Sequence, residues 1–255
     1  MCIKDRVNSG YVTNDGLEIT GNFVFLKDSP LKWDMNANIS FNKNKIGGLS
    51  GDQYAERLWY GADDVFIQRN GCPIGAIYGY VEDGFYDNLA EVRADPQYRH
   101  VSDAVAKSMI GEIKYRDLNG DGVINEKDRT IIGDTNPKFT YGVTNNFSWK
   151  SFNLSFMFQG TYGNDIFNGN LIDIKMGNIG NITQEAYETR WTADNTENAK
   201  WPKATAGYDR TMKISNRYVE NGSYLRLKTL TFGYTFKPAQ SSFFRVFNSI
   251  NVYFN

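Results

Sequence analysis

The feature that most restricts the fold is a strict alternation of apolar and polar residues from Leu31 to Asn42. An apolar side chain at every second position is the pattern of a β-strand with one apolar and one polar face. The stretch also has about the 9 to 11 residues that a tilted, membrane-crossing strand requires. It predicts a long strand whose apolar face carries Leu31, Trp33, Met35, Ala37, Ile39 and Phe41.

Five further segments alternate in the same way, and we predict each of them to be a strand. Two short turns, Lys27–Pro30 and Lys150–Ser151, each join two of the predicted strands into a hairpin. In one segment the phase of the alternation changes near Lys228 and Thr229, which predicts a β-bulge. The five segments are Leu17–Phe25, Phe139–Trp149, Phe152–Phe158, Tyr224–Phe236 and Ile250–Phe254.

The connections between these strands differ greatly in length. The turns Lys27–Pro30 and Lys150–Ser151 are very short, whereas the connections Asn42–Lys138 and Gly160–Arg217 are long and polar. Outer-membrane barrels have this asymmetry, with short periplasmic turns and long extracellular loops. We therefore predict an all-β chain that is part of a large antiparallel transmembrane β-barrel with long extracellular loops. Two more strands are expected within Asn42–Lys138.

Aromatic residues make up 15% of the chain, and several of them fall near the two tight turns. If these turns are periplasmic, the aromatic side chains lie at the periplasmic rim of the membrane. Rings with an apolar body and a polar tip form a girdle at that level. The residues expected there are Trp33, Trp149, Phe152, Tyr234 and Phe236.

A soluble β-sandwich shows the same alternation, so a secreted calcium-binding sandwich of the carbohydrate-binding kind is the alternative fold. The two folds place the apolar side chains in different surroundings. In the barrel, lipid contacts Trp33, Met35, Ile39, Phe147 and Phe156, while a polar lumen contacts Asp34, Asn36, Asn38, Asn146 and Ser155. In the sandwich, the same apolar side chains pack against a second sheet.

The charge balance argues against a nucleic-acid partner. The chain has 28 basic and 29 acidic residues and a formal net charge of -1, so it lacks the basic surface that phosphates require. Its two cysteines, Cys2 and Cys72, are too few for a disulfide framework. The first ten residues contain no apolar segment typical of a signal peptide, so we expect that signal to lie upstream.

An acidic segment from Asp117 to Asp128, DLNGDGVINEKD, fits the spacing of an EF-hand-like calcium loop. Alternate side chains of such a loop converge on the ion, and Gly122 at the sixth position permits the sharp turn. The last position holds Asp128, which is shorter than the usual Glu. The predicted ligands are Asp117, Asn119, Asp121, the backbone carbonyl of Val123, Asn125 through water, and Asp128.

The alternative for this segment is a turn rich in Asx and Gly residues that needs no metal. The flanking sequence does not suggest two helices, because Glu112–Arg116 looks extended and Thr130–Pro137 looks like a loop. A calcium ion here would hold an extracellular loop together and would not take part in chemistry.

No catalytic constellation is evident, so we do not expect an enzyme. The single histidine, His100, has no partner nearby in the sequence for metal binding or nucleophilic catalysis. Neighbouring acids such as Glu82 and Asp83 are interpreted as solvated loop residues.

Four stretches together resemble the SusC/RagA family of TonB-linked outer-membrane proteins. The most specific joins the acidic loop to a predicted hairpin without interruption. The four are LKWDMNANISFNKNKI, CPIGAIYGYVEDGFYD, YRDLNGDGVINEKDRTIIGDTNPKFTYGVTNNFSWKSFNLSFMFQG and NGSYLRLKTLTFGYTF.

The resemblance implies a plugged barrel of about 22 strands in a Gram-negative, Bacteroidetes-like outer membrane. Residues 1–255 would supply its C-terminal portion, with the plug and signal peptide upstream and the last strand unfinished. It also implies import of glycan oligomers or peptides, energised by the TonB complex through the upstream region. A SusD-like surface lipoprotein would close over the extracellular mouth.

Overall fold

The computed structural model describes residues 10–57, 64–175, 181–205, 213–237 and 249–255. The chain divides into two compact units, which are described separately. The sheet unit comprises Asn14–Asn44, Asn136–Asn164 and Gly222–Asn255. The loop unit comprises Met1–Thr13, Lys45–Thr135 and Asp165–Asn221.

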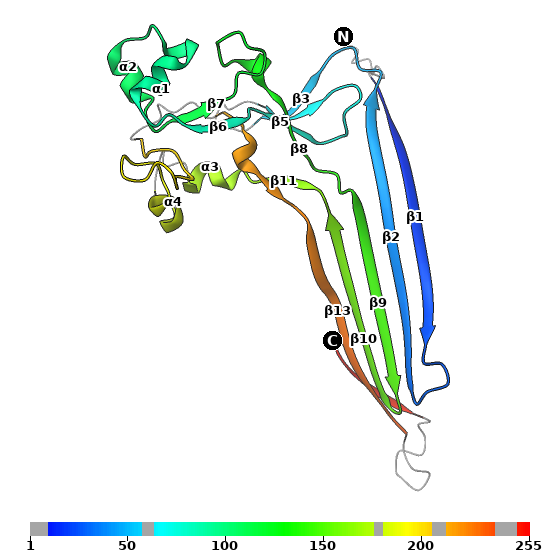
Figure 1. Cartoon of the computed structure of the whole chain (residues 1–255). Coiled ribbons are helices and arrows are strands. Elements are labelled where there is room, and N and C mark those ends of the chain that lie inside the picture. The colour runs from blue at the N-terminus through cyan, green and yellow to red at the C-terminus, as the bar shows by residue number, and fades with distance from the viewer. Residues whose placement is uncertain (1–9, 58–63, 176–180, 206–212, 238–248) are drawn as a thin grey trace, which may run out of the picture. The chain divides into compact units, whose positions relative to one another are not determined.

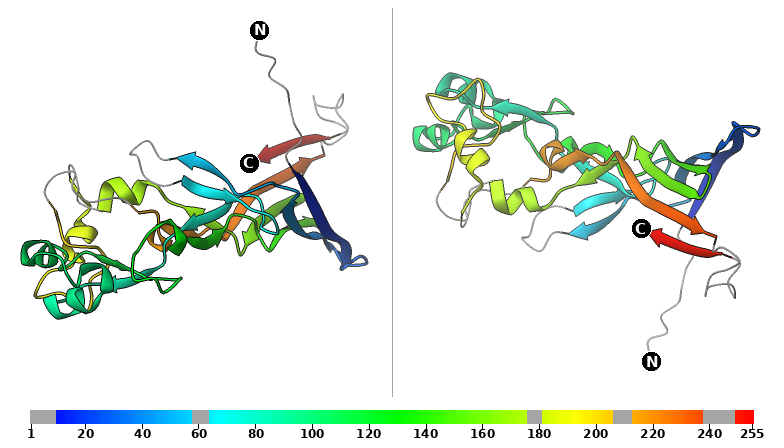
Figure 2. Two further views of the ribbon diagram at one scale, coloured as in Figure 1. Left: turned by 90° about the horizontal axis from the view of Figure 1, so that it is seen from above. Right: turned by 90° about the horizontal axis from the view of Figure 1, so that it is seen from below.

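Six strands form one sheet, in the order β1-β2-β9-β10-β13-β14 (Figure 1). Neighbouring strands from β2 to β14 are antiparallel. β1 and β14 form the two edges, as Figure 2 also shows. The strands are β1 (Tyr11–Phe25), β2 (Leu31–Gly47), β9 (Phe139–Trp149), β10 (Phe152–Tyr162), β13 (Tyr224–Phe236) and β14 (Ile250–Phe254). All six strands predicted from the alternation are therefore confirmed.

The turns and the bulge agree with the sequence pattern. Lys150 has a φ of 54°, which lets the chain reverse within two residues and places Trp149 opposite Phe152. Met157 of β10 pairs with Thr229 of β13, whereas the next residue, Phe158, pairs with Leu227. Lys228 is thus the extra residue of a β-bulge, as predicted.

The loop unit contains short strands in three small sheets. β3 (Gln53–Arg57), β4 (Asp64–Gln68), β5 (Ala76–Gly79) and β8 (Thr130–Asp134) form one sheet in that order. The other sheets pair β6 (Glu82–Phe85) with β7 (Ile113–Tyr115), and β11 (Asp165–Phe167) with β12 (Val219–Asn221).

Two expectations for this region are corrected. The connection that was expected to hold two more strands contains six short ones, β3 to β8. The prediction of a loop at Thr130–Pro137 is wrong for its first part, because β8 pairs with β5. Polar and glycine residues around Ile131 and Ile132 interrupt the alternation that would predict a strand here. Pairing with β5 stabilises the strand. The extended conformation expected at Glu112–Arg116 is confirmed by β7.

Short helices complete the loop unit. Three α-helices have an N-cap residue whose side chain accepts a hydrogen bond from a backbone N–H of the first turn. These residues are Asn88, Ser102 and Thr183. None of the helices in the described part of the chain is long and apolar enough to cross a membrane. The helices are α1 (Leu89–Ala94), α2 (Asp103–Ser108), α3 (Asn170–Lys175) and α4 (Gln184–Glu188), with single 3₁₀ turns at Pro96–Tyr98, Glu126–Asp128 and Asn216–Tyr218.

The hydrophobic core lies in the loop unit. Its largest cluster joins strands and helices that are far apart in the sequence, and Ile77, Ile214 and Tyr218 are almost completely buried in it. A smaller cluster packs Tyr86 and Val92 against α2 and its neighbours. The loop unit therefore has the interior of an independently packed body.

Candidate functional site

One face of the six-stranded sheet is apolar across β2, β9, β10 and β13. The register places Trp33 opposite Phe147, Phe147 opposite Leu154, and Leu154 opposite Phe232. The ring of Trp33 stacks on Phe25 at 4.3 Å and on Phe147 at 5.5 Å between centroids. The residues predicted to contact lipid share this face: Trp33, Met35, Ile39, Phe147 and Phe156.

The opposite face carries a connected set of amide, hydroxyl and carboxylate groups. Asn146 Nδ2 donates a hydrogen bond to Asp34 Oδ2 at 2.7 Å, and Ser155 Oγ donates to Asn146 Oδ1 at 2.7 Å. These two bonds link β2, β9 and β10. The residues predicted to face a polar lumen share this face: Asp34, Asn36, Asn38, Asn146 and Ser155.

A single amide interrupts the apolar face of β9. Asn145 lies between Val143 and Phe147 on that face and is buried. Its Oδ1 accepts a hydrogen bond of 3.0 Å from the indole Nε1 of Trp33. The break in the alternation at position 145 signals this residue in the sequence, but not its partner on β2.

Large aromatic side chains gather at the end of the sheet where the tight turns lie. Trp149 stacks with Phe152 at 6.2 Å between centroids, and Phe152 lies 4.9 Å from Tyr234. Leu31 and Phe152 both pair with Trp149, so the two hairpins end at the same level. The predicted clustering of aromatic residues at one end is confirmed.

The sheet unit does not have the layered arrangement of a β-sandwich. Its described strands form one sheet, and none of their apolar side chains belongs to the buried clusters of the molecule. In a sandwich these side chains would fill the space between two sheets. The alternative fold is therefore incorrect for the described residues.

The acidic segment is a tightly wound loop in the loop unit. The carboxylate of Asp117 accepts hydrogen bonds of 2.7 Å from the backbone N–H groups of Gly120 and Gly122. Gly122 has a φ of +79°, a conformation that glycine adopts without strain. The sharp turn expected at the sixth position is confirmed.

The last predicted ligand, Asp128, is fully buried beneath the loop. Its carboxylate accepts hydrogen bonds from the backbone N–H groups of Leu118 at 3.0 Å, Asn119 at 3.4 Å and Asn125 at 2.8 Å. Burial raises the pKa of Asp128, but these donors and a hydrogen bond with Asp117 outweigh burial. The pKa is consequently below its ordinary value of 3.8.

The other predicted ligands bond to one another within the same loop. Asn119 Nδ2 donates to Asp121 Oδ2 at 3.0 Å, Val123 N donates to Asp121 Oδ1 at 2.9 Å, and Asn125 Nδ2 donates to the Val123 carbonyl at 3.0 Å. Across the described residues, no three His, Cys, Asp or Glu side chains stand close enough to hold a metal ion. These bonds are those of an Asx- and Gly-rich turn. Calcium binding stays a prediction.

The structure corrects the interpretation of one acidic pair. Glu82 is not solvated, because it forms an ion pair with Arg217 in which the two side chains are only 9% and 11% exposed. The hydroxyl of Ser215 also donates to Glu82, at 2.5 Å. Its neighbour Asp83 is half exposed, as expected, and His100 is exposed in a turn.

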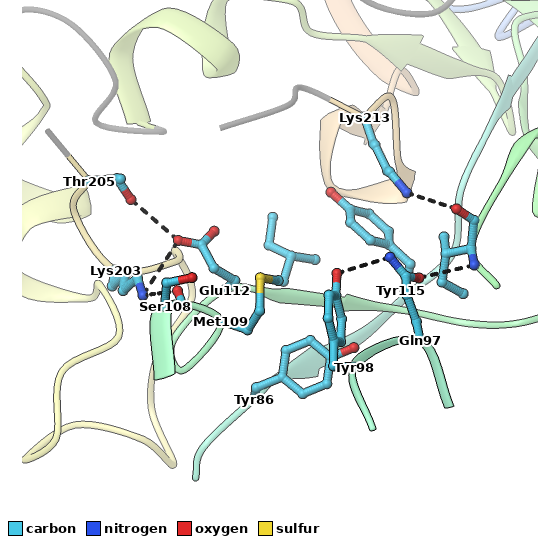
Figure 3. Close-up of a pocket in the computed structure, with 12 residues that line it drawn as sticks. Tyr86, Gln97, Tyr98, Ser108, Met109, Glu112, Tyr115, Lys203, Thr205 and Lys213 are labelled. Atoms are coloured by element: carbon cyan, nitrogen blue, oxygen red, sulfur yellow. Dashed lines mark hydrogen bonds and ion pairs between the residues drawn. The ribbon is translucent and has the colours of Figure 1, made fainter. Parts of the chain in front are cut away.

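A cavity of about 510 Å³ lies within the loop unit. Figure 3 shows Glu112 with Lys203 and Thr205 on one side of this cavity, and Tyr115 with Lys213 on the other. This cavity has no local sequence signal, because its lining comes from two segments about ninety residues apart.

Two tyrosines in mutual contact line the cavity. The rings of Tyr86 and Tyr98 meet edge to face at 5.8 Å and 90°. The hydroxyl of Tyr86 donates to Asp95 Oδ2 at 2.5 Å, and Gln97 Nε2 donates to the hydroxyl of Tyr98 at 3.2 Å. Burial first, and then the hydrogen bond to Asp95, raise the pKa of Tyr86 well above its usual range. Tyr86 is therefore a neutral, fixed hydrogen-bond donor.

No family model matches the chain. The TonB-dependent receptor P3 of Formosa agariphila is 34% identical over 236 residues, which is 89% of this chain and 22% of that receptor. The TonB-dependent receptor SusC of Bacteroides thetaiotaomicron is 26% identical over 235 residues, which is 90% of this chain and 21% of that receptor.

The fold has counterparts among solved structures. A chain in the structure of the RagAB peptide transporter matches with a TM-score of 0.74 and 19% identity, covering 96% of this chain and 25% of that one. This chain spans about a fifth of the length of the curated relatives that it matches. The agreement in sequence and in fold covers the sheet unit and the loop unit alike. The chain belongs to the SusC/RagA family of TonB-dependent receptors.

Proposed function

We propose that this chain forms part of the wall and the outer loops of an outer-membrane barrel that imports nutrients with energy supplied through TonB. The observation that carries the proposal is the sheet itself, which has one aromatic and aliphatic face and one hydrogen-bonded polar face. A sheet with this division meets hydrocarbon on one side and water on the other. The names of the relatives support the same function.

The tight turns are assigned to the periplasmic side and the loop unit to the cell surface. The aromatic cluster around Trp149 and Phe152 then lies at the periplasmic rim, where such a girdle stabilises a barrel. The long connections have a packed core of their own, which suits a surface that must present a defined shape to a partner. We assign that partner as a SusD-like surface lipoprotein, and the transported solutes as glycan oligomers or peptides.

The acidic loop is proposed to bind Ca²⁺ and so to hold its part of the loop unit in one shape. Its twelve-residue spacing, the left-handed conformation of Gly122 and the carboxylates of Asp117 and Asp121 support this role. Titration of the full-length receptor with Ca²⁺ is expected to slow hydrogen exchange in residues 117–128. A matched titration with Mg²⁺ serves as the control, and equal exchange with and without Ca²⁺ would exclude the role.

Isolation of the full-length receptor from its native membranes tests the main proposal. We expect the receptor in the outer-membrane fraction and, after mild detergent extraction, a surface lipoprotein in a stable equimolar complex with it. Deletion of the TonB energy-coupling protein is expected to stop growth on the imported nutrient. A receptor that fractionates with soluble proteins, or that carries no lipoprotein, contradicts the proposal.

A further inference from the structure

We propose that Asn168 is a site of spontaneous deamidation, and that its product loosens the pairing of β11 with β12. The chain contains four Asn–Gly pairs, which begin at Asn70, Asn119, Asn168 and Asn221. In such a pair the backbone nitrogen of the glycine can attack the preceding side chain, because glycine has no Cβ that obstructs the approach. The hydrogen bonds of the four pairs decide which of them reacts first. The inference goes beyond the import function and does not depend on it.

The reaction needs water as its only co-reactant. The nitrogen of Gly169 gives up its proton and bonds to Cγ of Asn168, while the side-chain nitrogen takes up a proton and leaves as ammonia. Water then opens the resulting succinimide ring. Opening at Cγ gives aspartate, and opening at the main-chain carbonyl gives isoaspartate, in which the chain runs through Cγ. No group is oxidised or reduced in either step.

Three of the four pairs hold the glycine N–H in a hydrogen bond of 2.7 or 2.8 Å, which must break before the nitrogen can attack. The acceptors are the Ile46 carbonyl for Gly71, Asp117 Oδ1 for Gly120 and the Asn164 carbonyl for Gly222. Two of the side-chain amides are also fixed on both sides. Asn70 bonds to the N–H and the carbonyl of Leu49, at 2.9 and 2.8 Å. Asn119 bonds to the N–H and the carboxylate of Asp121, at 2.8 and 3.0 Å.

Asn168 differs in both respects. Among the described residues, no acceptor takes the Gly169 N–H in a hydrogen bond. Within the same part of the chain, the Asn168 side chain makes one hydrogen bond, from Nδ2 to Glu220 Oε2 at 3.1 Å, and Glu220 is exposed. Asn168 and Gly169 are half-buried, so water reaches the pair. Asn168 should therefore react faster than the other three asparagines.

The reaction changes the chain where β11 ends and α3 begins. The Asn168 backbone N–H donates to the Tyr218 carbonyl at 2.7 Å, and the Asn168 carbonyl accepts from the Leu171 N–H at 3.3 Å. An isoaspartate lengthens the main chain by one carbon between these two groups. Either product also places a carboxylate beside Glu220, to which the amide now donates, and like charges repel. Both changes weaken the contact between β11 and β12.

The test is peptide mapping by mass spectrometry after the folded full-length receptor has been incubated in detergent at mildly alkaline pH. We expect aspartate and isoaspartate to form at position 168 about tenfold faster than at positions 70, 119 and 221, the effect of one hydrogen bond that must first break. In the denatured receptor the four rates should converge, because the four pairs share the same reacting atoms. The difference then comes from the fold.

Gly169→Ala is the matched variant, because a Cβ at this position would lie no closer than 3.4 Å to the ring of Phe167. It should slow the reaction at Asn168 severalfold and leave hydrogen exchange in β11 and β12 unchanged. Asn168→Asp reproduces the charge of the product and should speed hydrogen exchange in β11 and β12. Asn168→Gln keeps the amide and should leave that exchange nearly as it is.

Conversion at position 168 that is no faster than at the other three positions of the folded receptor overturns the assignment of the site. Conversion that Gly169→Ala does not slow overturns it as well, because the nitrogen of residue 169 is then not the attacking group. If Asn168→Asp leaves hydrogen exchange unchanged, the product does not loosen β11 from β12. The measurement needs neither transport nor a ligand, so these outcomes leave the import function untouched.

Discussion

The two units of this chain use apolar side chains in opposite ways. In the loop unit, Ile77 and Tyr218 are 0% and 1% exposed and belong to a packed cluster. In the sheet unit, Leu230 and Phe232 are 50% and 46% exposed on one continuous face. Apolar surface left in water forgoes about 25 cal/mol for each Å² that could be buried. The loop unit therefore buries its apolar side chains in a core of its own. The sheet unit exposes them on a face whose favourable surroundings are hydrocarbon.

The two units also differ in where their polar groups find hydrogen-bond and ion-pair partners. The loop unit buries Glu82 with Arg217 and Asp128 under backbone donors, as a water-soluble domain does. In the sheet unit, the polar groups that join β2, β9 and β10 lie on one face, and the apolar face of β9 carries the buried amide of Asn145. Four substitutions test this difference between the two units.

The largest effect is expected from Glu82→Ala in the loop unit. The substitution leaves Arg217 buried without its carboxylate, which costs about 3 to 5 kcal/mol. Hydrogen exchange should show this loss as a lower free energy of local opening in β6 and its partners, with the sheet unchanged. The double variant Glu82→Ala with Arg217→Met should recover much of the loss. An unchanged loop unit after Glu82→Ala would mean that the ion pair does not hold it together.

Next in size is Ile39→Arg on the apolar face of β2. A charge in the middle of a lipid-facing strand costs about 2 to 4 kcal/mol of barrel stability. The neighbouring substitution Ser40→Arg, on the polar face, should cost less than about 1 kcal/mol. Unfolding of the full-length receptor from lipid vesicles measures both. Equal costs for the two variants would contradict the assignment of the faces.

A smaller loss, about 1 to 3 kcal/mol, is expected from Trp33→Phe. Phenylalanine fills most of the space but cannot donate to Asn145, which is left unsatisfied on the apolar face. The same unfolding measurement should show that adding Asn145→Leu to Trp33→Phe restores stability. If Trp33→Phe is neutral, the indole hydrogen bond does not stabilise the sheet.

The smallest effect, about 1 kcal/mol, is expected from Asp128→Asn. Because the folded pKa of Asp128 is depressed, its ionised form stabilises the loop at pH values above 3.8, and this contribution is lost as the pH falls through the lower folded pKa. Local opening of residues 117–128, followed from about pH 6 to pH 3, should become easier in the original protein. The Asp128→Asn variant should lack this part of the pH dependence. If local opening depends on pH in the same way in the original protein and in the variant, Asp128 is not the titrating group.

The sequence was a good guide to the sheet because one physical rule governs it. A strand between lipid and water must alternate, so the six strands, the turn at Lys150 and the bulge at Lys228 are all visible in the pattern. The hydrogen bond from Trp33 to Asn145 could not be predicted. The break in the alternation marks Asn145 but does not indicate which residue bonds to it.

The loop unit could not be predicted in the same way. Its helices have only five or six residues, too few for helical periodicity to appear, although the capping residues Asn88, Ser102 and Thr183 mark where they begin. The pairing of Glu82 with Arg217 joins residues 135 positions apart. The cavity likewise joins distant segments, so neither feature has a local signal.

Two neighbouring residues of β2, Met35 on the apolar face and Asn36 on the polar face, show which face of the sheet contacts lipid. Each is replaced by cysteine in a full-length receptor in which every native cysteine, including Cys2 and Cys72, is replaced by serine. The new cysteine is labelled with a fluorophore in vesicles that contain brominated lipids. We predict strong quenching at position 35 and little at position 36. Equal quenching at both positions, or stronger quenching at position 36, would show that the apolar face of the sheet does not contact lipid.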